Sequence, residues 1–142
     1  MTRRRLLISA VGVAACVLIL AGLRGLMMLG YVDSAIGRVR AITTAEAQFT
    51  KTHPEVGYTC ILSQLPHDEQ IARLVKDGKD NGYIFGIIGC QLTESKKPNS
   101  MYHVLARPLH SGLPAFCSDE SGIIRSAKGG SIEKCLTSGV PI

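Results

Sequence analysis

Four cysteines in the C-terminal part of the chain are the residues with the clearest chemistry. They are Cys60, Cys90, Cys117 and Cys135, whereas Cys16 lies inside an apolar run and serves as a small apolar side chain there. An even number of cysteines outside the cytoplasm is typical of disulfide bonds. Four cysteines permit three pairings. We predict Cys60–Cys90 and Cys117–Cys135, because the loops between nearest neighbours cost the least entropy to close. Each bridge is expected to contribute about 2–4 kcal/mol.

A metal site and a thiol nucleophile are the alternatives to bridging. Zinc ligands are usually separated by roughly two to four residues, and no two of these cysteines are so close. The histidines show no ligand spacing either; they are His53, His67, His103 and His110. A small thiol-dependent enzyme, with a cysteine activated by a histidine, is one competing hypothesis. The sequence has no serine nucleophile elbow, carboxylate pair or phosphate-binding loop, so we expect no cofactor and no enzymatic activity.

A long apolar segment near the N-terminus is expected to place these cysteines outside the cytoplasm. Residues 6–23 contain no charge, and as a helix of about 1.5 Å rise per residue they span close to the thickness of a bilayer core. The long side chain of Arg24 can reach the interface. We therefore predict a transmembrane helix over residues 6–30. Three arginines, Arg3 to Arg5, favour a cytoplasmic N-terminus over residues 1–5 and an exported domain over residues 31–142. The predicted location is a bacterial inner membrane.

Three other interpretations of this segment are a cleaved signal peptide, a lipoprotein signal and a twin-arginine signal. Residues 13–16, VAAC, resemble a lipobox in which Cys16 would carry the lipid. However, the apolar residues 17–20 follow it, where a lipoprotein normally becomes polar. The length and unbroken apolarity of the run favour an uncleaved membrane span.

The charge distribution argues against nucleic-acid binding. The formal net charge is +5, but without Arg3, Arg4, Arg5 and Arg24 the 16 basic residues fall to 12, against 11 acidic ones. A nucleic-acid-binding domain usually has a basic face and stacking aromatic residues, and this chain has no Trp. We expect the membrane and other protein subunits to be its partners.

Apolar residues at helical spacing predict that the helix continues to Thr52 and ends before Pro54. Arg38, Arg40 and Glu46 are expected to face water. The apolar stripe needs a cover, which a sheet of the same domain can supply. The stripe is also the candidate assembly face for neighbouring subunits, through Ile36, Val39, Ile42 and Phe49.

The rest of the chain predicts a small antiparallel sheet. Strands are expected at residues 83–90, 101–106, 115–117 and 123–125, short helical segments at 61–65 and from 67 onward, and loops or turns at 77–82, 93–100, 108–114, 118–122 and 128–131. Tyr83, Phe85 and Tyr102 are expected in the core. The predicted fold class is α+β, with a long N-terminal helix on an antiparallel sheet.

Several short motifs resemble type IV pilin-like proteins of the kind found in acidobacteria. They are AITTAE at residues 41–46, Gly57-Tyr58, GYIF at residues 82–85, and FCSDESGIIR at residues 116–125. The last is similar to the FCSDQSGVIR hairpin of that family and is the most specific. The likeness covers about residues 39–125. It implies a pilin or pseudopilin fold and a non-enzymatic subunit of a pilus or of a type II secretion-like system.

The N-terminus departs from the pattern of that family. Prepilins have a Gly before the cleavage site and a Glu shortly after it. Here no Gly precedes Leu6, and no acidic residue lies between Leu6 and Gly30. The alternative to a filament subunit is therefore a free-standing, membrane-tethered extracytoplasmic binding module.

Two acidic positions are weighed as sites. Asp119 and Glu120 lie in a predicted turn and resemble a calcium loop, but Ca²⁺ needs about six or more oxygen ligands. We therefore expect Ser118 and Asp119 to cap the backbone of their own turn. Glu46 is a candidate for pairing with a neighbouring subunit, although such a residue is usually solvated.

Overall fold

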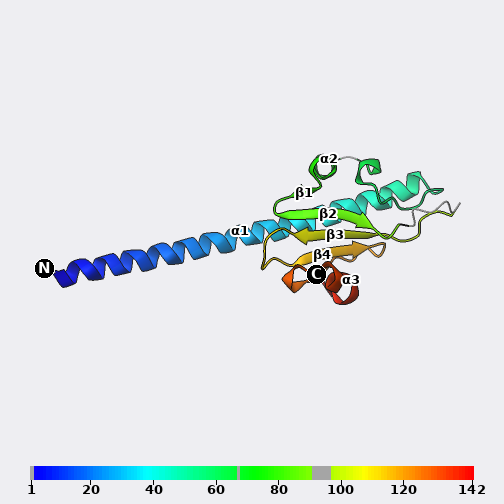
Figure 1. Ribbon diagram of the computed structural model, residues 1–142. Helices are drawn as coiled ribbons and strands as arrows, with labels where there is room; N and C mark the ends of the chain where they lie inside the picture. Colours follow the sequence, from blue (N-terminus) through cyan, green and yellow to red (C-terminus); the bar gives the residue numbers. More distant parts are fainter. Residues whose placement is uncertain (1, 67, 91–96) are drawn as a thin grey trace. The chain divides into compact units, whose positions relative to one another are not determined.

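The computed structural model describes residues 2–66, 68–90 and 97–142, with side chains for residue 13 and from residue 15 onward in those ranges. His67, residues 93–96 of the predicted loop and the side chains of Arg3 to Arg5 lie outside the described part. The chain divides into two units, residues 1–30 and 31–142. Helix α1 (Thr2–Thr52) runs through both and ends before Pro54, as expected (Figure 1).

The second unit is built on a six-stranded sheet in which every strand pairs antiparallel with its neighbour in the sequence. The strands are β1 (Lys79–Asp80), β2 (Tyr83–Ile88), β3 (His103–Pro108), β4 (Ala115–Asp119), β5 (Arg125–Ala127) and β6 (Val140–Pro141). The α+β prediction is confirmed. Strand β3 begins and ends two residues later than the predicted range 101–106, because its pairing with β2 continues until Pro108 lies opposite Tyr83.

One face of the sheet packs on the part of α1 that belongs to the second unit, as Figure 1 shows for β2 and β3. Alternate residues of β2 point toward the helix: Tyr83, Phe85 and Ile87 are buried, while Ile88 is exposed. This is the period of two expected of a strand with one covered face. The predicted core positions Tyr83, Phe85 and Tyr102 are confirmed, and the core cluster also contains Val104 and Phe116.

Short helices close the two sides of the sheet. The predicted turn at residues 61–65 is the short helix η1 (Leu62–Gln64). Helix α2 (Glu69–Asp77) begins at its N-cap Asp68, which accepts a hydrogen bond from the Ile71 amide, and ends at Gly78 with a φ of 63°. The predicted glycine turn contains η2 (Lys128–Gly130).

Helix α3 (Ile132–Ser138) and strand β6 are not predicted by the sequence pattern. Ser131 caps α3 by accepting a hydrogen bond from the Lys134 amide. The helix covers β4 and β5 on the face opposite α1, where a second small core forms from Ala115, Cys117, Ala127 and Cys135. The sheet is therefore covered on both faces, by α1 on one and by α3 on part of the other.

Candidate assembly interface

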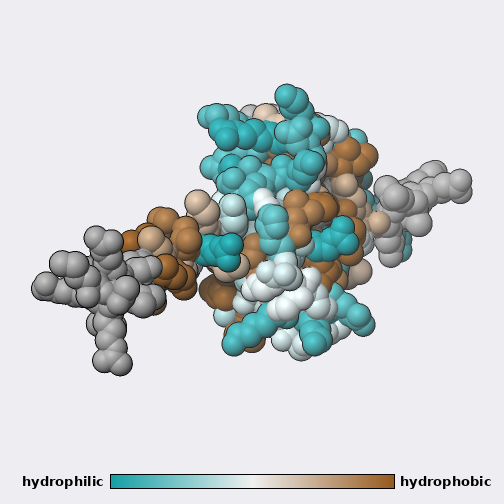
Figure 2. Space-filling view, turned by 60° about the vertical axis from the view of Figure 1, so that its left-hand side comes forward, coloured by the Kyte–Doolittle hydropathy of each residue, from teal (hydrophilic) through white to brown (hydrophobic). Residues whose placement is uncertain are grey.

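The described residues of the first unit form an exposed apolar helix. Every side chain from Ala15 to Gly30 is exposed within the chain, and the large apolar ones keep between 46% and 73% of their surface. By length and composition, the described helix from Ala15 to Thr52 is long and apolar enough to cross a membrane. Figure 2 shows hydrophobic side chains gathered at the left of the view, whereas hydrophilic residues cover much of the visible face of the second unit. So much apolar surface needs lipid or another chain to cover it.

Three of the four residues of the predicted assembly face are buried within the chain's own core. Val39 and Ile42 are fully buried and Phe49 is 6% exposed, all within the core beneath the sheet, while Ile36 is partly buried against the same core. The sheet of the same chain covers most of this stripe, because its own inner face is also apolar. Val39, Ile42 and Phe49 therefore pack within their own domain.

The free face of α1 in the second unit carries a groove instead. The groove has a volume of about 620 Å³ and lies between this helix and the segment that leads into α2. Small and polar side chains of the helix line one wall, including Gly37, Ala41 and Thr44, and Pro66 and Ile71 belong to the other wall. Arg40 and Thr44 are exposed and Ala41 is half-buried, so contacts with another subunit are sterically open on this face.

Glu46 is the main site residue that the sequence interpretation placed wrongly. It is fully buried rather than solvated. Its Oε2 accepts a hydrogen bond from the Thr59 amide at 3.0 Å, while its Oε1 has no partner among the described residues. Burial raises the pKa of Glu46 to about 7, against the opposing effect of the Thr59 hydrogen bond. The carboxyl group therefore fixes the loop after α1 to the helix and is unavailable to a neighbouring subunit.

The Cys60–Cys90 disulfide joins this loop to the end of β2, with the predicted pairing. Both cysteines are half-buried, and the Cys90 amide donates a hydrogen bond to the Cys60 sulfur. A second contact holds the same loops together at Gly57, which has a φ of +75° and forms a bridge with Asn99. A Cβ atom at Gly57 would lie 2.2 Å from the Asn99 carbonyl oxygen, so only glycine permits this close approach.

The Cys117–Cys135 disulfide also has the predicted pairing and joins β4 to α3. Its two cysteines are 1% and 0% exposed. All four cysteines of the second unit are thus bonded, and none of them is a free thiol nucleophile. Cys16 is the free cysteine and is exposed on α1.

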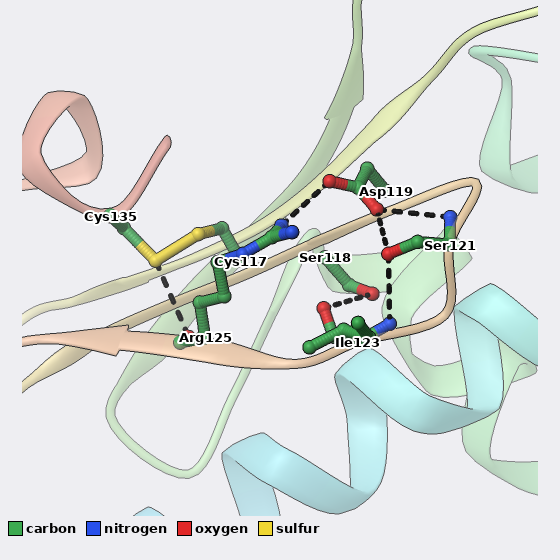
Figure 3. Close-up of polar contacts among 7 residues, drawn as sticks. All are labelled: Cys117, Ser118, Asp119, Ser121, Ile123, Arg125 and Cys135. Atoms are coloured by element: carbon green, nitrogen blue, oxygen red, sulfur yellow. Dashed lines mark hydrogen bonds and ion pairs between the residues drawn. A yellow bond between two sulfur atoms is a disulfide. The ribbon is translucent and has the colours of Figure 1, made fainter. Parts of the chain in front are cut away.

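The turn between β4 and β5 is held by Asp119 (Figure 3). Asp119 Oδ1 accepts hydrogen bonds from the amide and hydroxyl of Ser121, and its Oδ2 accepts one from Arg125 Nη1 at 2.6 Å. Ser118 Oγ donates to the Ile123 carbonyl at 3.1 Å. Burial opposes the ionisation of Asp119, but the hydrogen bonds from Ser121 and Arg125 lower its pKa below the usual value. Both carboxylate oxygens are already engaged, so the turn-capping interpretation is confirmed.

The geometry thus distinguishes an exposed apolar helix from a disulfide-bonded domain in which Glu46 and Asp119 hold the domain's own loops. Comparisons of the chain with known protein families, with curated proteins and with solved structures found no match.

Proposed function

We propose that the chain is a membrane-anchored, pilin-like structural subunit that assembles through α1 and catalyses no reaction. Its apolar segment would lie in a bacterial inner membrane, with residues 1–5 in the cytoplasm and the unit of residues 31–142 outside. The assembly in question is a pilus or a type II secretion-like system, in which homologous or identical subunits pack through their helices.

One observation carries this proposal: a single helix has an exposed apolar part followed by a part that is buried under an antiparallel sheet. A soluble protein gains nothing from the exposed part, since apolar surface of this extent is unstable in water. The two disulfides support an oxidising compartment for the domain. The open groove on the free face of α1 is compatible with a helix of another subunit.

Site-specific photo-cross-linking in native membranes tests the assembly. A photoreactive amino acid is placed at Leu20, in the exposed apolar part, or at Thr44, in the groove, which leaves the disulfides untouched. Assembly predicts adducts at twice the mass of the chain, or with another helix-bearing subunit, from both positions. The matched control is Glu133, an exposed position on α3, which should give no such adducts.

Two outcomes would count against the proposal. Recovery of the chain in the soluble fraction, without detergent, would exclude a membrane anchor. A membrane-bound chain that gives only lipid adducts at Leu20 and no protein adduct at Thr44 would instead identify it as a free-standing tethered module.

A further inference from the structure

A shallow hollow lies on the second unit, close to Tyr31, the first residue of that unit. Its volume is about 410 Å³, and it is lined by Asp77, Lys79, Asn81, Leu109 and His110, with Asp80 and Gly82 completing the wall. Two turns form it, one before β2 and one after β3, and a hydrogen bond of 2.7 Å from the Leu109 amide to the Gly82 carbonyl holds them together.

The hollow is joined to the first residues of the second unit, which follow the apolar segment in the sequence. Tyr31 is the first residue of the second unit and follows Leu29 by only two positions, about 3 Å of helical rise. The Tyr31 ring stacks on His110, with 6.1 Å between ring centroids. Asn81 donates a hydrogen bond to Ser34 at 2.8 Å, so the other turn is also fixed to the first turns of this part of the helix.

The charges that remain free in the hollow have both signs. Asp80 is engaged by Arg38 at 2.7 Å, but Asp77 and Lys79 are exposed on either side of Gly78. Leu109 adds an apolar side chain that keeps 51% of its surface. The hollow thus combines one anionic, one cationic and one exposed apolar side chain. A complementary ligand would carry a cationic group, an anionic group and an apolar part.

We propose that this hollow binds the headgroup of a zwitterionic phospholipid from the bilayer that holds the apolar segment. This inference rests on the proposed membrane anchoring. Lys79 pairs with the phosphate, Asp77 with the ammonium group, and Leu109 contacts the upper part of an acyl chain. The lipid contact would restrict the domain to one orientation, in which the hollow faces the membrane surface.

Tryptophan fluorescence of the full chain reconstituted into vesicles can detect the contact, because the natural chain has no Trp. Ser111→Trp places a single reporter beside His110. Ser100→Trp is its matched control, since both serines are exposed and lie beyond opposite ends of β3. The vesicles consist of phosphatidylglycerol with a small fraction of phosphatidylcholine that is spin-labelled near the top of one acyl chain.

We expect several-fold stronger quenching of the Ser111→Trp reporter than of the Ser100→Trp reporter, and stronger than the mole fraction of labelled lipid alone would give. The double variant Asp77→Asn, Lys79→Gln should reduce the quenching to the mole-fraction value. The double variant Glu133→Gln, Lys134→Gln removes the same pair of charges from exposed positions on α3 and should change nothing.

Flotation of the vesicles separates the possible failures. A chain that does not float with the lipid overturns the membrane anchoring and this inference together. If the chain floats but the two reporters are quenched equally, the domain end does not contact the bilayer and only the inference fails. The inference also fails if the Asp77 and Lys79 substitutions leave the quenching of the Ser111→Trp reporter unchanged, since the hollow would then lie near lipid without binding it.

Discussion

The two disulfide-bonded regions of the domain achieve stability by different means. The Cys117–Cys135 bridge lies in a small core of its own, with both cysteines excluded from solvent, beside a turn whose Asp119–Arg125 pair is complete. The Cys60–Cys90 bridge is half-buried and joins loops. Those loops are held to α1 by Glu46, a buried carboxyl group with one unpartnered oxygen.

The two regions thus have one covalent link each but differ in how that link is packed. Chain entropy alone would make the two bridges nearly equivalent, since their sequence separations are 30 and 18 residues and the loop term depends only on the logarithm of length. Packing and the charge state of neighbouring groups must therefore decide which region opens first. Four measurements can break or sharpen the comparison.

The largest expected effect is in the rate of reduction. With Cys16 alkylated beforehand, a dithiol reductant should open Cys60–Cys90 about a hundredfold faster than Cys117–Cys135, because attack on the buried sulfurs requires a local opening of several kcal/mol. Timed alkylation of the released thiols followed by peptide mass spectrometry measures both rates. Equal rates would show that solvent exposure does not distinguish the bridges.

The next effect is the pH dependence of the Glu46 region. The pKa of Glu46 is about 7 in the folded state, above its ordinary value of 4.5. Between these two pH values the folded state therefore keeps a proton that the unfolded state has lost. The free energy of unfolding should therefore fall by about 3 kcal/mol as the pH rises from 4.5 to 7, and level off above that. Denaturant unfolding of the full chain in detergent micelles measures this slope.

Glu46→Gln should abolish that slope, because the amide is neutral at every pH. Glu69→Gln is the matched control: this residue is exposed on α2 and paired with Arg73, and its loss should leave the slope intact. A slope that persists in Glu46→Gln would assign the pH dependence to another group.

A smaller effect is expected at the other bridge. Asp119→Asn weakens the pairing with Arg125 and the cap on Ser121, and should cost about 1–2 kcal/mol of unfolding free energy at neutral pH. Because the folded pKa of Asp119 is lowered, the difference from the wild type should shrink as the pH falls through that pKa. Glu120→Gln, at the exposed neighbour, should stay within about 0.5 kcal/mol.

The smallest effect concerns the helix cap beside the buried bridge. Ser131→Ala removes the N-cap of α3 at a cost of about 1 kcal/mol, which should speed reduction of Cys117–Cys135 about fivefold and leave Cys60–Cys90 unchanged. Asp68→Ala removes the N-cap of α2 and should not change the rate at Cys117–Cys135. A faster Cys117–Cys135 reduction in both variants would mean that the bridge opens only with the whole domain.

Local patterns were sufficient to predict most of the fold. Alternation in β2, the apolar period of α1 and the proline after it are local signals, and the predicted bridges follow from nearest-neighbour loops. The position of Glu46 also had a local signal that was overlooked: it lies four residues after Ile42 and three before Phe49, on the buried stripe.

The remaining features depend on contacts that the sequence does not display. The amide that satisfies Glu46 comes from Thr59, beyond the end of the helix. Helix α3 has only seven residues and gains its stability from Ser131 and from the core around Cys135, not from its own periodicity. An apolar stripe indicates only that something covers it, and for Val39, Ile42 and Phe49 the cover is the sheet of the same chain.

The sequential order of the six strands has a consequence for biogenesis. A protein that crosses a membrane from its N-terminus emerges gradually, and parallel or crossed topologies must wait for distant segments before pairing. If the domain is exported as proposed, each strand of this chain would meet a partner that has just been translocated. Strand pairing would then proceed during export and shorten the time for which unpaired edges are exposed to aggregation.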